Sequence, residues 1–302
     1  MTVTRRRVLA IAASWAGAAL VPGAAVARSH WQGRALGADA SLVLDGPEDR
    51  AQAVLSDLRG LLEHVETQFS LHDPRSALAR LNRTGVLHDP HPDFSALLDL
   101  AGRLHAATGG RYDPTVQPVW AALAEGRDPA AARASVGWYR VLRTPDAIRL
   151  GRGQALTLNG LAQGFATDLA AALLDRHGLQ KGLINLGEYA ARGGPWRIGV
   201  EDPDYGMVLT RTLNGTAIAT SSPGALRFGS GQGHILDPHG AAPPVWSTVT
   251  VEAAHAAVAD GLSTAACLAD AQTLSRFMTR HAAVFGVTRL TAIDSDGNVR
   301  TF

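Results

Sequence analysis

The sequence predicts an α+β fold in which two interwoven subdomains share one hydrophobic core. Segments with the helical spacing of apolar residues, at 47–68, 94–108 and 253–268, are separated by short segments that alternate apolar and polar residues as strands do. No linker rich in Pro, Gly or Ser divides the 302 residues into two halves. Because 46% of the residues are hydrophobic, a chain of this length can bury a large core.

The first 27 residues have the composition of an export signal. Three arginines, Arg5-Arg6-Arg7, precede an alanine-rich apolar run to Val21, and an Ala-x-Ala sequence follows at Ala25-Val26-Ala27. We interpret this pattern as a twin-arginine signal peptide cleaved after Ala27, which leaves 28–302 as the mature domain and predicts a periplasmic location. The alternative, an uncleaved membrane anchor, is disfavoured because the apolar run is shorter than the ~20 residues that span a bilayer.

The composition disfavours several classes of function. Residues 1–27 hold three of the 28 Lys and Arg residues and none of the 27 acidic residues, so the mature chain has a net charge of −2, and no basic surface for nucleic acid is expected. Cys267 is the only cysteine, which excludes an internal disulfide and a zinc site built on paired cysteines. Lys181 is the only lysine, which disfavours Schiff-base and P-loop chemistry.

The first part of the mature chain is predicted to alternate strand and helix. The alternating end of 34–44 indicates a strand, and the apolar residues on one side of 47–68 indicate a helix. Ser76 is placed to cap a short helix that ends at Asn82. Another helix is predicted over 94–108. The segment around Ser76 is compatible both with a binding loop and with a capped loop that holds no ligand.

The richest stretch lies in the middle of the chain. A hairpin is predicted over 145–158, with Leu156 and Leu158 in its second strand, followed by a tight turn at Asn159-Gly160. A helix follows over 165–174, closed by Gly178, and then a strand over 182–186. Glycines at a strand-to-helix turn allow a ligand to approach the backbone, and the helix start attracts phosphate. The alternative is a packing unit whose glycines serve only the turns.

The C-terminal part combines strands with a helix that carries candidate metal ligands. Strands are predicted at 196–200, 217–220 and 249–251. In the alanine-rich helix 253–268, Asp260 and Thr264 are four residues apart and share one face, with Ser263 adjacent. Carboxylate, hydroxyl and carbonyl oxygens are ligands that Mg²⁺ accepts. The same spacing also occurs by chance on helices that bind no metal.

His234 precedes a strand-like Ile235-Leu236 and a turn. A histidine beside a turn commonly has a structural role, but its unperturbed pKa of about 6.5 also suits it to accept a hydroxyl proton. Thr220-Ser221-Ser222 invites comparison with hydrolases. A serine nucleophile is disfavoured there because no G-x-S-x-G sequence surrounds these residues.

In chain order, these segments resemble the ApbE family of FAD:protein FMN transferases. The matching motifs are FSLHDPRSALARLN, GGRYDPT, LNGLAQGFATD, INLG, ATSS, HILDPHG and ADGLSTA. The match runs from Leu36 to Thr264, nearly all of the mature chain, although Gln163 stands where the family usually has lysine. The resemblance implies a T-fold-like α+β architecture with mixed or antiparallel sheets, packed helices, and FAD in a cleft between the subdomains.

The resemblance also implies a reaction and a set of site residues. Such enzymes use Mg²⁺ to transfer FMN from FAD to a Ser or Thr hydroxyl of an acceptor protein, releasing AMP. By motif, Asp260 and Thr264 would hold the metal with the backbone oxygen of Ala162, Ser263 would assist, and His234 would be the base. The flavin and adenine would lie among Leu36, His72, Arg111, Tyr112, Asp113, Asn159, Phe165 and Leu236.

Two further functions would use the same pocket. One is Mg²⁺-dependent hydrolysis of FAD to FMN and AMP, and the other is binding of FAD without turnover. The expected partners of the leading function are FAD and an exported electron-transfer flavoprotein that carries a Ser/Thr flavinylation motif. No nucleic acid is expected, and the membrane is expected to be reached only through the acceptor.

Overall fold

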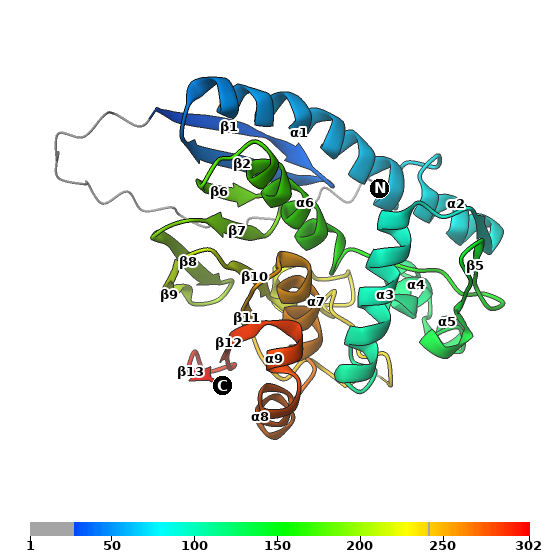
Figure 1. The fold of residues 1–302 in the computed structure, drawn as a ribbon. Coiled ribbons are helices and arrows are strands. Elements are labelled where there is room, and N and C mark those ends of the chain that lie inside the picture. The colour runs from blue at the N-terminus through cyan, green and yellow to red at the C-terminus, as the bar shows by residue number, and fades with distance from the viewer. Residues whose placement is uncertain (1–26, 241) are drawn as a thin grey trace.

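The protein is built around an eight-stranded antiparallel sheet with helices packed on one face (Figure 1). The computed structural model describes residues 27–240 and 242–302, so the predicted signal peptide, apart from Ala27, lies outside the described residues. In spatial order, the strands are β1 (Arg28–Ala35), β2 (Ala38–Asp45), β6 (Lys181–Asn185), β7 (Tyr189–Arg192), β10 (Ala217–Ser221), β11 (Thr248–Ala253), β12 (Val287–Ile293) and β13 (Val299–Thr301).

Helices α1, α6 and α7 form the layer that covers this sheet, and the remaining helices lie around its ends. The helices are α1 (Glu48–Phe69), α2 (Ala77–Thr84), α3 (Pro92–Ala107), α4 (Gln117–Ala124), α5 (Ala130–Arg133), α6 (Ala162–Arg176), α7 (Ala256–Ala266), α8 (Ala271–Arg280) and α9 (Ala282–Phe285). Among the described residues, none of these helices has both the length and the apolar character needed to cross a bilayer.

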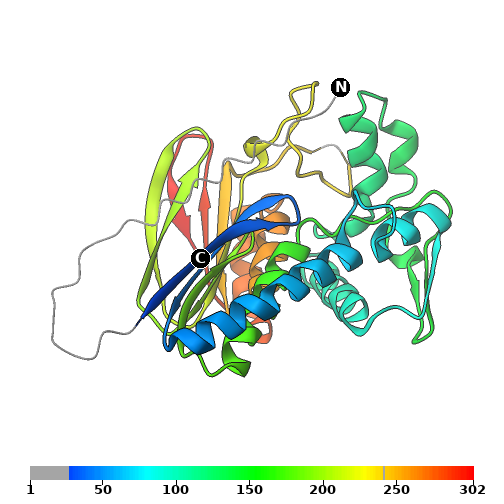
Figure 2. The same cartoon turned by 90° about the horizontal axis from the view of Figure 1, so that it is seen from above.

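The two faces of the sheet are buried by different partners. Along β10, Ala217 and Ala219 face the helical layer, whereas Ile218 between them faces a hairpin of β8 (Trp196–Asp202) and β9 (Gly206–Leu213). Figure 2 shows this hairpin, in yellow-green, on the side of the sheet away from α1 and α7. Because the residues of β10 that face the helices are small, α7 can approach this strand closely.

A second, mainly helical part lies beyond the end of the large sheet. It contains α2 to α5 and a three-stranded antiparallel sheet of β3 (Val86–His88), β5 (Ala147–Arg149) and β4 (Leu142–Arg143). Its core is continuous with that of the large sheet. A small apolar cluster of Val119, Phe228 and Leu236 connects this part to the loop that follows β10. The predicted α+β class with interwoven parts is therefore confirmed.

The long helices begin and end close to where the sequence predicts. α1 covers Glu48–Phe69 against a prediction of 47–68, and α3 covers Pro92–Ala107 against 94–108. The Ser76 hydroxyl accepts the backbone N–H of Ala79 at 3.0 Å and so caps α2, although that helix continues to Thr84. Helical periodicity was sufficient to locate α1 and α3, and the side-chain cap was sufficient to locate the start of α2.

The predicted hairpin over 145–158 is wrong. β5 pairs with β3 and β4, and Leu156 and Leu158 belong to no strand. The Asn82 side chain holds Leu156 instead: its amide donates to the Leu156 carbonyl at 2.9 Å and its oxygen accepts the Leu156 N–H at 2.7 Å. Because this side chain satisfies both backbone groups, the extended segment needs no neighbouring strand.

Other segments also differ from the prediction, including the helix expected over 165–174, which as α6 covers Ala162–Arg176. The strand expected over 34–44 is the end of β1 and most of β2, joined by a turn at Leu36-Gly37. The helix expected from Ala253 begins at Ala256, because β11 continues to Ala253. Ile235 and Leu236 also form no strand. The turn is the most informative difference, because Leu36 has a left-handed φ of 47°, which is uncommon for a residue with a side chain.

Candidate active site

Two neighbouring hollows meet at the start of α6. The first hollow is lined by residues of α6, α7 and the loops after α3, β6 and β10, and the second by the β1–β2 turn and the end of α1. Asn159 and Gln163 line both. The first hollow contains the predicted residues Arg111, Tyr112, Asp113, Asn159, His234, Leu236, Asp260 and Thr264. The second contains the predicted residues Leu36, His72, Asn159 and Ala162.

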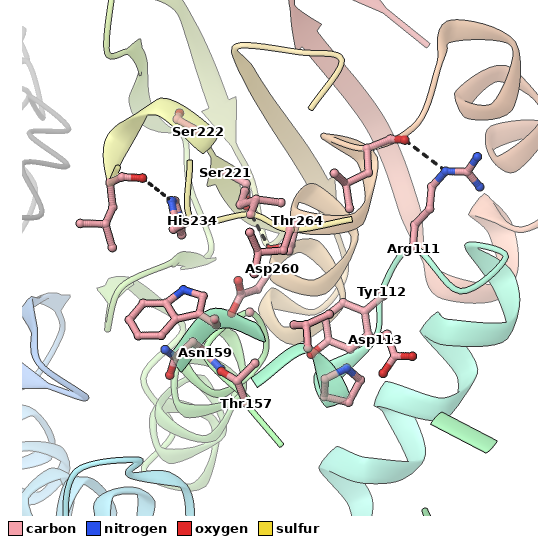
Figure 3. A pocket seen from close by; sticks show the side chains of 18 of the residues that line it. Arg111, Tyr112, Asp113, Thr157, Asn159, Ser221, Ser222, His234, Asp260 and Thr264 are labelled. Atoms are coloured by element: carbon pink, nitrogen blue, oxygen red, sulfur yellow. Dashed lines mark hydrogen bonds between the residues drawn. The ribbon is translucent and has the colours of Figure 1, made fainter. Parts of the chain in front are cut away.

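Asp260 lies in the middle of α7 and lines the first hollow (Figure 3). Its carboxylate accepts the backbone N–H of Gly164 at 3.1 Å, and the residue is only 4% exposed. This contact joins α7 to the first turn of α6. A side chain at position 164 could not fit there. A Cβ atom on Gly164 would lie 2.4 Å from the carbonyl oxygen of Ala256. The sequence therefore places a glycine where the two helices touch.

Thr264 lies one helical turn after Asp260 and faces the Asn159-Gly160 turn. A Cβ atom on Gly160 would lie 3.1 Å from the Thr264 hydroxyl oxygen, so the absence of a side chain leaves this hydroxyl beside the backbone. Ser221, at the end of β10, is 3.2 Å from the Thr264 hydroxyl. The sequence prediction that Asp260 and Thr264 lie on one face, near the glycine turn, is confirmed.

Ser263 is placed differently from its neighbours on α7. It is fully buried, and its hydroxyl is 2.8 Å from that of Ser221 and 3.0 Å from the Asp260 carbonyl oxygen, to which it donates. It lines neither hollow. Its contacts therefore position Ser221 and the α7 backbone, and its expected role as a direct metal ligand is not supported by its place in the fold.

Tyr112 and Asp113 form the wall opposite α7. Burial raises the pKa of Tyr112 well above its usual value, and the negative charges of Asp260 and Asp113 raise it further. The phenol is therefore protonated at neutral pH. Asp113 accepts the N–H and hydroxyl of Thr115 at 2.8 and 2.6 Å and so fixes the following turn. Arg111 donates to the Leu268 carbonyl at 3.2 Å, which ties this wall to the end of α7.

His234 lies on the loop between β10 and β11 and lines the first hollow from the side opposite α6 (Figure 3). Its Nδ1 is 3.3 Å from the carbonyl oxygen of Leu226, which can only accept. In the neutral ring this contact assigns the proton to Nδ1 and makes Nε2 the acceptor nitrogen. A proton acceptor thus lies in the same hollow as the Asp260 carboxylate.

The second hollow is shaped by a strained turn. The N–H of Leu36 donates to the Glu66 carboxylate at 2.8 Å, which holds the left-handed turn against α1. Phe165 does not line either hollow. It packs edge-on against Phe69, with ring centroids 5.7 Å apart, and contacts the core. The expected contact of Phe165 with a flavin or adenine ring is therefore not found among the residues that line the hollows.

Several lining residues were not among the predicted site residues. Glu188 lines the first hollow, and its carboxylate accepts the Thr220 N–H at 3.3 Å. Ser221 belongs to the ATSS motif, so that motif already contained a signal for it. Trp120 also lines this hollow, but it lies on α4, outside the motifs, and nothing in its local sequence indicates the role.

The geometry agrees with what comparison with known proteins finds. A model of the ApbE family matches residues 36–286, which include every predicted site residue. The chain belongs to the ApbE family. The membership predicted from its motifs is thus confirmed.

Relatives and solved structures of the ApbE family agree with this assignment. The FAD:protein FMN transferase of Klebsiella pneumoniae is 26% identical over 255 residues, covering 74% of this chain and 73% of that protein. The one of Rhodobacter capsulatus is 32% identical over 161 residues, covering 48% of this chain and only 29% of that protein. The ApbE structure from Thermotoga maritima is similar in fold, with a TM-score of 0.80 at 22% identity, and the match covers 91% of this chain and 96% of that one.

Proposed function

We propose that this protein is an FAD:protein FMN transferase that uses Mg²⁺ to transfer FMN to a Ser or Thr hydroxyl of an acceptor protein and releases AMP. The observation that carries the proposal is the meeting of Asp260 and Thr264 with the Asn159-Gly160 turn in a hollow that also contains His234. Membership of the ApbE family and the names of the relatives support the same reaction.

The donor atoms around Asp260 fit a hard divalent cation. They are oxygens: the carboxylate of Asp260, the hydroxyl of Thr264 and, beside them, the hydroxyl of Ser221. Ala162, the first residue of α6, lines the adjoining second hollow, and its backbone oxygen is the third expected donor. Mg²⁺ prefers such oxygen ligands and completes its shell with phosphate and water. When bound, the ion would neutralise charge on the pyrophosphate of FAD.

The two hollows offer room for the two halves of a dinucleotide. They meet at Asn159 and Gln163, which line both hollows, so one extended ligand could reach from the first hollow into the second. Gln163 can donate a hydrogen bond to a phosphate oxygen, although it lacks the charge of the lysine usual in the family. The buried phenol of Tyr112 remains a neutral neighbour of Asp260, so it adds no negative charge near the phosphates.

His234 is the proposed base of the transfer step. The acceptor hydroxyl oxygen forms a new bond to the phosphorus of the FMN half and passes its proton to Nε2 of His234. The bond from that phosphorus to the bridging oxygen breaks, and AMP leaves with the electron pair. Leu226 supports this role because its carbonyl accepts from Nδ1, which places the lone pair of the neutral ring on Nε2.

The test is incubation of the protein with FAD, Mg²⁺ and a flavin-acceptor domain that carries the Ser/Thr motif. We expect fluorescence covalently attached to the acceptor and an equal amount of AMP. AMP formed without labelled acceptor would indicate that water replaces the hydroxyl and would favour hydrolysis. FAD binding with neither product would refute catalysis and leave a flavin-binding protein.

We further propose that the protein acts in the periplasm on an exported electron-transfer protein. The support is the Arg5-Arg6-Arg7 start and the Ala25-Val26-Ala27 exit in the sequence. Replacing Arg5 and Arg6 by lysine is expected to retain the protein in the cytoplasm, as measured by cell fractionation. Unchanged export of that variant would contradict the twin-arginine assignment.

A further inference from the structure

A second group of metal-ligating side chains lies away from both hollows, between α1 and the start of α3. His64 comes from α1, His91 is the residue before α3, and Asp93 lies in the first turn of α3. One potential ligand atom from each residue lies within 4.8 Å of the others. None of the three residues lines the first or the second hollow.

The distances in this group fit the spacing of ligands around one ion. His64 Nε2 is 2.8 Å from Asp93 Oδ2, and His91 Nδ1 is 3.6 Å from the same oxygen. Ligands about 2.0–2.1 Å from a tetrahedral zinc ion lie roughly 3.3 Å from one another, between these two values. The side chains of His64 and Asp93 are 29% and 31% exposed and that of His91 is 46% exposed. Water can therefore reach the group and supply a fourth ligand.

We propose that His64, His91 and Asp93 bind a borderline transition-metal cation such as Zn²⁺ and thereby link α1 to α3. Two imidazoles and one carboxylate are typical ligands of zinc, copper or nickel, whereas Mg²⁺ prefers an all-oxygen shell. The chemistry of this group thus differs from that of the oxygen donors around Asp260, and the two sites are expected to select different ions.

Binding would replace two contacts that hold the group together. His64 Nε2 is hydrogen-bonded to the Asp93 carboxylate, and His91 Nδ1 accepts the backbone N–H of Asp93 at 3.1 Å as the cap of α3. A metal ion takes the lone pairs that both imidazole nitrogens can offer when the rings are neutral. The two rings are already in contact, with centroids 4.5 Å apart.

The position of the group gives the ion a structural consequence. Five residues after His64, Phe69 ends α1, stacks on Phe94 of α3 and lines the second hollow. An ion that fixes α1 to α3 would therefore stiffen one wall of that hollow without entering it. Because the ion binds only the folded arrangement of the two helices, it should raise thermal stability.

The test uses the untagged protein and Zn²⁺ as the probe, in millimolar Mg²⁺ so that the oxygen site is saturated. Titration calorimetry is expected to show one Zn²⁺ per chain that Mg²⁺ does not displace. His64→Ala and His91→Ala should each weaken Zn²⁺ binding at least tenfold, and the double variant should lose the rise in melting temperature that Zn²⁺ gives the wild type. Bound Co²⁺ should show visible absorption bands that these variants lack.

His88→Ala is the matched control. His88 is exposed, lies three residues before His91 and is not part of the group, so this variant should bind Zn²⁺ like the wild type. Circular dichroism and flavin transfer should be unchanged in all three single variants, because none of these residues lines either hollow. Equal Zn²⁺ affinity of the wild type and the double variant, or loss of binding in His88→Ala, would overturn the proposal.

Discussion

Asp260 connects the contact between two helices to the proposed chemistry. Its carboxylate accepts the Gly164 N–H, faces the first hollow and contributes to the raised pKa of Tyr112. A substitution at this residue therefore acts on packing and on charge together. Asparagine separates the two effects better than alanine, because the amide oxygen can still accept from Gly164 while the negative charge is lost.

Asp260→Asn is expected to reduce flavin transfer roughly 100-fold or more, because a neutral amide is a poor Mg²⁺ ligand. The measurement is the transfer rate as a function of free Mg²⁺, and the midpoint should move to higher concentration. Asp237→Asn, in a neighbouring loop, is the control for the loss of one carboxylate. If the Asp260 variant keeps the wild-type rate at limiting Mg²⁺, Asp260 is not a metal ligand.

His234→Ala is expected to slow transfer about 10²- to 10⁴-fold, because the acceptor hydroxyl loses its base, while FAD affinity changes little. Single-turnover kinetics and FAD titration measure the two quantities separately. His239→Ala provides a control in the same loop, since His239 donates to the Gly109 carbonyl at 2.9 Å and does not line the first hollow. A collapse of FAD affinity with an unchanged rate at saturation would make His234 a binding residue.

At the scale of elements, the start of α7 depends on a side chain from another helix. The Asp168 carboxylate of α6 accepts the N–H groups of Ala256 and Ala257 at 2.7 and 3.0 Å, which are the first free donors of α7. Burial raises the pKa of Asp168, although these two hydrogen bonds act in the opposite direction. This cap orients the helix that carries Asp260.

Asp168→Ala is expected to destabilise the protein by about 1–3 kcal/mol, because two buried N–H groups lose their acceptor. Urea denaturation measures the loss, and Mg²⁺ affinity should fall with it because α7 carries the proposed ligands. Asp168→Asn should lose less stability, since its amide retains an acceptor oxygen. Equal stability of the alanine variant and the wild type would show that this cap does not hold α7.

The elements also show how far sequence patterns could predict this fold. Periodicity located α1 and α3 because each long helix repeats its signal over several turns. It failed for Leu156 and Leu158, where alternation arises in an extended segment held by the Asn82 side chain rather than by a strand. A contact across 74 residues leaves no mark in the local sequence.

In the candidate site too, relations set within one element could be predicted from the sequence, and those set by distant neighbours could not. Asp260 and Thr264 could be predicted to share a face because that relation is set within one helix. The motifs of the family placed most other lining residues in advance. Ser263 and Phe165 line neither hollow, because the direction of a side chain depends on neighbours, here Ser221 and Phe69, that spacing along the chain does not specify.

At the scale of the whole molecule, Asp202 joins the β8–β9 hairpin to the large sheet. Its carboxylate accepts the hydroxyls of Ser247 and Thr248, both at 2.6 Å, and two backbone N–H groups of its own turn. Burial alone would raise the pKa of Asp202, but the hydrogen bonds outweigh it, so the pKa lies below its usual value. Ionised Asp202 therefore stabilises the fold.

The protein is expected to lose stability in acid as Asp202 becomes protonated. The pKa of Asp202 is lower in the folded state than in the unfolded state. Its contribution to folding stability is therefore fully present above the unfolded-state pKa of about 3.9 and is lost as the pH falls through the folded-state pKa. Asp202→Asn should unfold more easily in urea at pH 7 and show a flatter decline between about pH 5 and 2. If the free energy of unfolding of this variant fell as steeply with pH as that of the wild type, Asp202 would not be the cause of the acid sensitivity.

The contact of α6 with α7 at Gly164 also limits how a large ligand can enter. A side chain at position 164 would overlap the Ala256 backbone, and the Asp260 carboxylate accepts the Gly164 N–H across the same contact, so α6 and α7 pack directly against each other. The segment from Leu226 to Leu236 borders the hollow and belongs to no helix or long strand. Its backbone hydrogen bonds are local, such as those from Phe228 to Gln232 and from His234 to Leu226. Dinucleotide admission should therefore be gated by this segment, and its amides should exchange with deuterium far sooner than those of the paired helices.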